Sequence, residues 1–226
     1  MKNILKPGST VLFQGDSITD CGRNRETSNE KPGNELGQGY PAKIAAIWEI
    51  LFPGSGVRFL NRGISGNRSS DLLERYEKDF RALNPDLISI LIGINDTWRR
   101  YDRNDPTAAD LFENRYRTLL GSIRRDMPKT IIVIMEPFLL GSIPERKIWR
   151  EDLDPKIQAV RGLAMEYADF FIPMDGIFAR CAVEGIREAD MAADGVHPTP
   201  LGHGIIASEW IRALESPPEK TYNKVR

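Results

Sequence analysis

The sequence predicts an α/β fold, in which helices cover both faces of one parallel sheet. Short apolar segments alternate five times with longer segments whose apolar residues recur every three or four positions. In addition, residues 87–92 (LISILI) are apolar at nearly every position, as expected of a central parallel strand covered on both faces. Strands and helices that alternate in this order form a parallel sheet with right-handed crossovers. We therefore expect a central five-stranded parallel sheet.

The first strand–helix–strand unit is expected within residues 10–61. Residues 10–14 (TVLFQ) form a short apolar strand that ends at Gly15. Residues 40–52 carry apolar side chains at helical spacing, and a Pro-Gly pair ends this helix. The second strand is residues 57–61 (VRFLN).

The central strand follows a second helix. Ser69 and Ser70 can cap this helix, whose apolar residues recur as far as Leu83, where an Asn-Pro pair stops it. The strand at residues 87–92 comes next, and a third helix over residues 107–126 leads to the fourth strand.

The last part of the chain supplies two more strands. Residues 130–135 (TIIVIM) are the fourth strand, and a charged helix at roughly residues 150–168 follows a loop rich in Gly and Pro. Residues 170–174 (FFIPM) are the fifth strand, in which a proline indicates an edge position. The last helix runs from near Thr199 to about Leu214.

One domain over residues 1–226 accounts for these elements, with its core at about residues 9–215 and a polar tail at residues 216–226 that we expect to fray. The net charge of −1 favours neither nucleic acid nor a membrane surface as a partner. The start, MKNILKPGST, lacks the apolar core of a signal peptide, so we expect a cytoplasmic protein. Cys21 and Cys181 are then expected to be free thiols.

Polar residues follow three of the strands, at the edge where open parallel sheets bind their ligands. They are residues 15–17 (GDS) after the first strand, residues 61–67 (NRGISGN) after the second and residues 93–96 (GIND) after the third. Residues 194–198 (DGVHP) lie between the last strand and the last helix and can fold over the same rim. These four segments form the candidate functional site.

Histidine limits the chemistry of this rim, because the chain has only two, His197 and His203. A nucleophilic serine needs a base, and the base needs an acid that orients it. Ser17 is the candidate nucleophile, His197 the candidate base, and Asp194, three residues earlier, the candidate orienting acid. His203 lies within the last helix and is expected to be a packing or surface residue.

The tetrahedral intermediate of an acyl transfer needs hydrogen-bond donors for its oxyanion. The candidates are the backbone N–H of Ser17, the backbone N–H of Gly63 and the side-chain amide of Asn95. Glycine at position 63 would let the backbone approach the substrate closely, because it has no side chain to obstruct it.

Each segment also has a purely structural interpretation. Residues 15–17 could be a turn with a capping serine, and residues 61–67 a plain turn or a weak echo of a nucleotide-binding fingerprint. Asn95 and Asp96 could be cap or turn residues, and an Asp three residues before a His is common by chance. The joint occurrence of all four segments at strand ends and in one loop favours the catalytic interpretation.

In combination, the segments resemble the SGNH, or GDSL-like, hydrolase family, whose four blocks match "GDSIT", "NRGISGN", "IGIND" and "DGVHP". The resemblance spans residues 11–214. It implies a flavodoxin-like three-layer α/β/α sandwich, an esterase mechanism without metal or cofactor, and a homo-oligomer. The usual leucine after the serine is Ile18 here, a mild change that leaves the catalytic residues in place.

The stretches "GDSITDCGR" and "IGINDTWRRYD" are closer still to the family's acetyl-xylo-oligosaccharide esterases, which implies an acetylated sugar as the substrate. Trp98 could then stack on a sugar and Arg99 could bind its hydroxyls; equally, Trp98 could pack in the core or at a subunit contact and Arg99 could form an ion pair. Asp16 is the third candidate for substrate binding, although we expect it to accept hydrogen bonds within its turn.

A lipase or lysophospholipase is the nearest rival, and it needs a broad apolar groove. The expected loops at residues 20–39 and 96–106 are instead polar. Their charged and amide residues are Arg23, Asn24, Arg25, Glu26, Asn29, Glu30, Arg99, Arg100, Asp102 and Arg103. This composition favours a short acyl group on a polar carrier, and it leaves thioesterase and arylesterase activities open.

Other classes fit less well. An α/β-hydrolase elbow requires glycine where Thr19 stands, a metallophosphoesterase requires a cluster of His and Asp ligands, and a dinucleotide site requires Gly-x-Gly-x-x-Gly after the first strand. A non-catalytic carbohydrate-binding protein is the alternative from a different class. We therefore predict a cytoplasmic serine esterase that removes acetyl groups from sugars.

Overall fold

The computed structural model describes residues 4–25 and 34–215, and the predicted tail at residues 216–226 lies outside them. All five strands pair in parallel, in the order β2-β1-β3-β4-β5. They are β1 (Thr10–Gly15), β2 (Arg58–Asn61), β3 (Leu87–Leu91), β4 (Ile131–Met135) and β5 (Phe170–Ile172). This is the flavodoxin-like strand order, and it confirms the predicted fold class.

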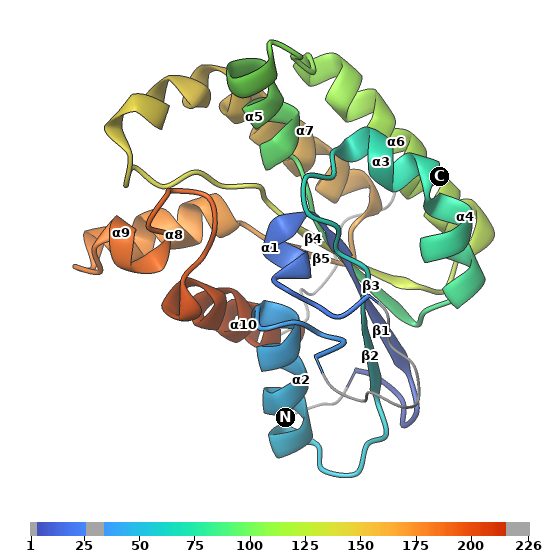
Figure 1. Ribbon diagram of the computed structural model, residues 1–226. Helices are drawn as coiled ribbons and strands as arrows, with labels where there is room; N and C mark the ends of the chain where they lie inside the picture. Colours follow the sequence, from blue (N-terminus) through green and yellow to red (C-terminus); the bar gives the residue numbers. More distant parts are fainter. Residues whose placement is uncertain (1–3, 26–33, 216–226) are drawn as a thin grey trace.

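Helices cover both faces of the sheet, as Figure 1 shows. One face carries α2 (Tyr40–Leu51), α8 (Met174–Val183) and α10 (Pro200–Glu215), and the other carries α3 (Ser69–Glu74), α6 (Ala109–Asp126) and α7 (Arg150–Tyr167). Successive strand residues alternate between the two layers, so that Val11 and Phe13 pack on one side and Leu12 on the other. Within the described ranges, no helix is both long enough and apolar enough to cross a bilayer.

The one polar residue in the central strand β3 is satisfied across the core. Ser89 is fully buried, and its hydroxyl accepts a hydrogen bond from the indole N–H of Trp210 in α10 (3.0 Å). Because a buried polar group is costly without a partner, this bond makes the position compatible with a strand that is covered on both faces.

The predicted edge strand ends earlier than expected. β5 stops at Ile172, and Pro173 precedes α8 as its N-terminal cap. Proline lacks the N–H that a strand ladder needs, so the strand ends where the proline begins. The prediction that β5 lies at an edge is confirmed.

The predicted helix that ends at Leu83 is broken into three pieces. They are α3, α4 (Tyr76–Asp79) and the 3₁₀ helix η1 (Arg81–Leu83). The first break falls at Arg75, whose guanidinium donates to the backbone oxygen of Gly15 (3.4 Å) and to Asn67 Oδ1 (2.9 Å). The Arg75 side chain thus ties this segment to the end of β1 and to the 61–67 segment that follows β2.

Four helices were not expected, namely α1 (Ser17–Asp20), α5 (Ile94–Arg103), α8 and α9 (Glu188–Met191). The prediction that residues 96–106 form a loop is therefore wrong for most of that range. In α5 the residues Ile94, Trp98 and Tyr101 pack against the core at helical spacing, while the residues between them are mostly charged.

Candidate active site

Ser17 stands directly after the first strand, at the start of α1. Asp16 is the N-terminal cap of that helix, because its Oδ1 accepts the N–H of Ile18 (3.0 Å). The capped turn expected at residues 15–17 is therefore present, but the capping residue is Asp16 rather than Ser17. This leaves the Ser17 hydroxyl available for another partner.

That partner is His197, which arrives from the loop before α10. The Ser17 hydroxyl lies 2.9 Å from His197 Nε2, and His197 Nδ1 lies 2.8 Å from Asp194 Oδ2. Because a carboxylate can only accept, Nδ1 carries the proton and donates it to Asp194, and Nε2 accepts from the serine. The other Asp194 oxygen accepts the N–H groups of Val196 (2.9 Å) and His197 (2.7 Å).

His197 and Asp194 each favour the charged form of the other. The hydrogen bond that His197 donates to Asp194 raises the pKa of His197 above its ordinary value, although partial burial and the Arg146 cation act in the opposite direction. Partial burial pushes the pKa of Asp194 upward, but the hydrogen bonds from His197 and Val196 outweigh it and hold the pKa well below its usual range. Asp194 thus stays ionised at neutral pH, as an orienting acid must.

The structure contradicts the expected role of Gly63. Its N–H already donates to Asn61 Oδ1 (2.8 Å), so it is not free to bind an oxyanion. A Cβ at this position would lie 2.4 Å from the backbone nitrogen of Asp20 and 2.8 Å from the carbonyl carbon of Thr19. Glycine is required here by the close approach of the 61–67 segment to α1, and not by the substrate.

A second glycine of the same segment has a free donor. Gly66 adopts a positive φ of 87°, and within the described ranges its N–H donates to no other group. Its neighbours in the chain, Ser65 and Asn67, contact Asp20 of α1 and Asn95 of α5 respectively. Gly66 therefore lies between the Ser17 helix and the Asn95 amide. The sequence contains both glycines, and nothing in it shows which N–H is free.

Asn95 is held in a fixed orientation by two neighbours. Its side-chain N–H₂ donates to the backbone oxygen of Asn67 (3.2 Å), and its Oδ1 accepts from Arg99 (3.2 Å). Arg99 also pairs with Asp102 (2.6 Å). Arg99 was expected either to bind sugar hydroxyls or to form an ion pair, and its contact with Asp102 matches the ion pair. Its second contact, with Asn95, helps to fix the Asn95 amide.

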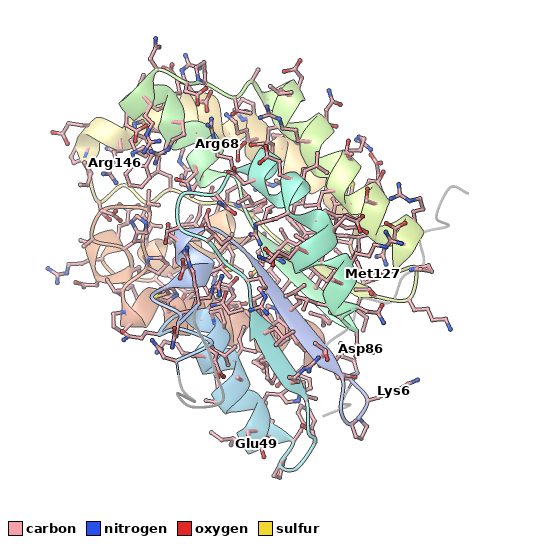
Figure 2. The ribbon with its side chains drawn as sticks, turned by 45° about the vertical axis from the view of Figure 1, so that its right-hand side comes forward. Lys6, Glu49, Arg68, Asp86, Met127 and Arg146 are labelled. Atoms are coloured by element: carbon pink, nitrogen blue, oxygen red, sulfur yellow. The ribbon has the colours of Figure 1, made fainter. Side chains whose placement is uncertain are left out.

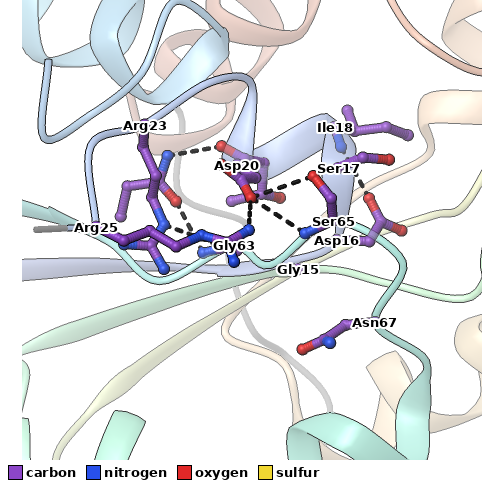
Figure 3. A network of polar contacts seen from close by, with 12 residues as sticks. Gly15, Asp16, Ser17, Ile18, Asp20, Arg23, Arg25, Gly63, Ser65 and Asn67 are labelled. Carbon is purple, nitrogen blue, oxygen red and sulfur yellow. Dashed lines mark hydrogen bonds and ion pairs between the residues drawn. The ribbon is translucent and has the colours of Figure 1, made fainter.

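A buried carboxylate joins the serine helix to the glycine segment. Asp20 lies at the end of α1 with a side chain that is 5% exposed. Its Oδ2 accepts the N–H (3.1 Å) and the hydroxyl (3.2 Å) of Ser65 and also contacts Arg25. Figure 3 shows Asp20 between these partners, and Arg23 donates to the backbone oxygen of Gly63 (2.7 Å) beside it.

A second buried carboxylate joins α3 to α5. Asp96 is fully buried and accepts both the N–H (3.0 Å) and the hydroxyl (2.7 Å) of Ser69. Burial raises the pKa of Asp96 to about 6. Because Asp96 follows Asn95 and Ser69 follows the 61–67 segment, this contact sets the distance between the two.

Asp16 itself is fully buried, and its Oδ2 has no hydrogen-bond partner among the described residues. Burial raises the pKa of Asp16 to about 7, opposed by its bond with Ile18 and by the nearby His197. Its visible role is the expected one, the acceptance of a hydrogen bond within the turn.

Trp98 is packed into the wall of the site. Its ring centroid lies 5.7 Å from that of His197 and 5.2 Å from that of Trp149, and the Arg146 guanidinium lies 4.7 Å from it. Trp98 is only partly buried. Arg146 was not predicted, because its contacts join three segments that are far apart in the sequence.

His203 is a buried packing residue, as one of its two interpretations expected. Its Nδ1 accepts the backbone N–H of Tyr40 (3.2 Å), so Nε2 carries the proton and faces the Cys21 sulfur (3.3 Å). Burial lowers the pKa of His203 to about 4. Both Cys21 and Cys181 are free thiols.

The candidate site contains the groups that nucleophilic chemistry requires: a serine, a base and an acid that orients the base. Within residues 4–25 and 34–215, no group of three His, Cys, Asp or Glu side chains is arranged to hold a metal ion. Of the residues in the predicted polar loops, Glu26, Asn29 and Glu30 lie outside the described residues.

Comparisons with known proteins agree on one family. The pattern of the GDSL-like Lipase/Acylhydrolase family matches residues 13–205. An acetylxylan esterase from Geobacillus stearothermophilus is 35% identical over 209 residues, which cover 92% of this chain and 94% of that protein.

The solved structures agree with the sequence comparison. A GDSL-like lipase from Parabacteroides merdae superimposes with a TM-score of 0.87 at 36% identity, over 93% of this chain and 97% of its own. The crystal structure of an acetylxylan esterase from Geobacillus stearothermophilus superimposes with a TM-score of 0.82 at 34% identity, over 98% of both chains.

Proposed function

The chain belongs to the GDSL-like lipase/acylhydrolase family and is a carboxylic ester hydrolase, and we propose that it removes acetyl groups from xylo-oligosaccharides or related acetylated sugars. The reaction uses Ser17 as the nucleophile, His197 as the base and Asp194 as the orienting acid. The observation that carries the proposal is the hydrogen-bonded chain of these three side chains. Ser17 Oγ lies 2.9 Å from His197 Nε2, and His197 Nδ1 lies 2.8 Å from Asp194 Oδ2.

In the first step the Ser17 oxygen attacks the acetyl carbonyl carbon while its proton passes to His197 Nε2. The imidazolium then protonates the departing sugar oxygen, which leaves an acetyl ester on Ser17. A water molecule, deprotonated by His197, attacks this ester and releases acetate. Asp194 remains ionised throughout and stabilises the imidazolium, in agreement with its low pKa.

Three donors are suited to the oxyanion. The N–H groups of Ser17 and Gly66 donate to no other group within the described ranges, and the Asn95 amide is held by Asn67 and Arg99. Donors that are fixed before the reaction stabilise a developing charge without the cost of reorientation. Gly66 thus takes the role that the sequence prediction had given to Gly63.

Two observations support a short acyl group on a polar carrier. A cavity of about 330 Å³ adjoins Gly66 and is lined by polar residues that include Arg68, Arg99 and Arg103. Guanidinium groups suit the hydroxyls of a sugar better than the hydrocarbon chain of a lysophospholipid. In addition, several of the matched structures are named acetylxylan or acetyl-xylooligosaccharide esterases, two of them as catalytic mutants in which a serine and a histidine are replaced.

The test is a rate comparison across acetylated xylo-oligosaccharides and p-nitrophenyl esters of increasing chain length, with Ser17→Ala as the control. We expect the highest kcat/KM on the acetylated oligosaccharides and a steep fall beyond acetate. A preference for long chains would favour a lysophospholipase or thioesterase instead, and a preference for aryl acetates an arylesterase. Lack of activity on every ester would favour a carbohydrate-binding protein.

The predictions of a homo-oligomer and of a cytoplasmic location are independent of this reaction. Sedimentation of the purified protein and fractionation of cells that express the full chain would test them.

A further inference from the structure

Arg146 occupies an unusual place beside the candidate site. It lies in the 3₁₀ helix η2 (Pro144–Trp149), which follows the loop after β4. Its guanidinium lies 4.7 Å from the ring centroid of Trp98 and 4.9 Å from that of Trp149, so two indoles fix its position. In Figure 2, Arg146 lies at the opposite end of the molecule from Lys6, Asp86 and Met127, where the strands begin.

The same guanidinium contacts Asp194, the proposed orienting acid. Nη1 donates to the backbone oxygen of Asp194 (2.6 Å) and lies 3.5 Å from its carboxylate Oδ2. That Oδ2 is the oxygen that accepts from His197, whereas Oδ1 is satisfied by backbone N–H groups of its own loop. Arg146 is therefore a cation from another segment that contacts both the main chain and the reactive oxygen of Asp194.

The surrounding segments are joined in the same way. The N–H of Leu140 donates to the backbone oxygen of Gly195 (2.9 Å), and the Ser142 hydroxyl donates to that of Ala192 (2.6 Å). Together with the Arg146 contact, these bonds attach the loop after β4 to the loop that carries Asp194 and His197. Arg146 is the only one of the three that is also in contact with the tryptophan next to the base.

We propose that Arg146 is a positioning residue for ester hydrolysis, which holds Asp194 and Trp98 so that His197 stays aligned with Ser17. The inference rests on the proposed function, since it assigns a task only if these three residues perform the reaction. It predicts that the planar guanidinium, and not merely a positive charge, is required, because an ammonium group cannot lie flat between two indoles while it donates to a carbonyl.

The electrostatic consequence can be separated from the geometric one. The charged groups that face His197 are Asp194 and Asp16, which raise its pKa, and Arg146, which lowers it. Arg146→Met removes both the planar guanidinium and the positive charge, whereas Arg146→Lys removes the guanidinium and keeps the charge. Lys147→Met is the matched control, because Lys147 is an exposed residue of the same 3₁₀ helix.

Arg146→Met and Arg146→Lys should both lose kcat on p-nitrophenyl acetate at the pH plateau, by roughly 10- to 100-fold and with little change in KM. A displacement of about 1 Å at a reacting group has an effect of this size. In Arg146→Met the pKa of His197 should also rise, while in Arg146→Lys it should stay near that of the unmodified protein. NMR can follow this directly, because the chain has two histidines and their titrations are well separated: burial lowers the pKa of His203 to about 4, whereas the hydrogen bond to Asp194 raises the pKa of His197.

A plateau kcat for Arg146→Met equal to that of Lys147→Met would overturn the inference. A reduced kcat together with an unmoved His197 titration and a lowered Tm would overturn it as well, because that pattern marks a general disturbance of the loop. Ser17→Ala, measured in parallel, separates this failure from that of the proposed function: only full activity of Ser17→Ala removes the mechanism itself.

Discussion

The two halves of the candidate site are built differently. The half that carries Ser17 and Gly66 rests on carboxylates that are almost completely buried, Asp16, Asp20 and Asp96. The half that carries Asp194 and His197 is open, with side chains that are 33% and 45% exposed. The first half is built into the ends of β1, β2 and β3, whereas the second is a surface loop attached to its neighbours at a few points.

This difference indicates how each half responds to change. Removing one of the buried carboxylates of the first half leaves its hydrogen-bond donors unpaired in the core, so both stability and activity should fall. In the exposed half, water can replace a lost partner, so activity should fall while stability changes little. The following variants test this contrast.

The largest effect is expected for Ser17→Ala. We expect kcat on p-nitrophenyl acetate to fall by roughly 10⁶-fold, as when single triad residues are removed from other serine hydrolases. Because Ser17 is not the cap of α1, the Tm should not change. Retention of full activity would remove Ser17 from the mechanism, and a large loss of Tm would show that Ser17 supports the turn.

Asp194→Asn should have the next largest effect. The amide cannot accept from His197 Nδ1–H as a charged partner and favours the wrong tautomer, so kcat should fall by roughly 10⁴-fold. The pKa of His197 should fall as well, because the hydrogen bond to Asp194 is the main cause of its elevation. An unchanged pH–rate profile and kcat would show that Asp194 is not the orienting acid.

Asp20→Ala tests the buried half. It leaves the N–H and the hydroxyl of Ser65 without their acceptor, at a cost of about 2 kcal/mol in the free energy of unfolding. Because Ser65 precedes Gly66, kcat should fall by up to about 10²-fold. Urea denaturation and initial rates measure both effects, and Glu77→Ala, which breaks an exposed ion pair with Arg81, is the control. A loss of activity without a loss of stability would contradict the contrast.

The smallest effect is expected for Asp16→Asn, in the pH dependence of stability. Asp16 has a pKa of about 7 when folded, well above that of an unfolded Asp (3.8). At a pH between these two pKa values, Asp16 is protonated in the folded protein and ionised in the unfolded chain. The contribution of Asp16 to the free energy of unfolding therefore decreases as the pH rises toward 7. Asparagine can still accept the N–H of Ile18 but does not titrate. The Tm of the variant should therefore fall less between pH 5 and pH 7 than the Tm of the parent protein. An equal fall in both proteins would show that Asp16 is ionised when folded.

The sequence predicted the sheet because its strands are short, apolar and separated by amphipathic helices. It failed at α5, where Ile94, Trp98 and Tyr101 have helical spacing but stand among charged residues that hide it. A helix of this kind is recognised only when its narrow apolar stripe meets a core. The segment at residues 96–106 was therefore interpreted as a loop.

The candidate site shows the same limit. The joint occurrence of the four segments, together with the scarcity of histidine, led to the prediction that Ser17, His197 and Asp194 act together, and the structure has these side chains within hydrogen-bond distance of one another. The choice between Gly63 and Gly66 depends on which N–H is already bonded, which is a property of the folded turn. Arg146 could not be found at all, because its partners lie in three separate segments.

The crowding at Gly63 has a practical consequence for directed evolution of this esterase. Any side chain at that position would collide with the main chain of Asp20, so a library randomised there should consist almost entirely of inactive clones. Arg68 and Arg103 instead line the polar cavity beside Gly66, where we propose that the sugar binds, and substitutions there change the shape and charge of that cavity. Screening effort for new acyl acceptors is therefore best concentrated on these two arginines.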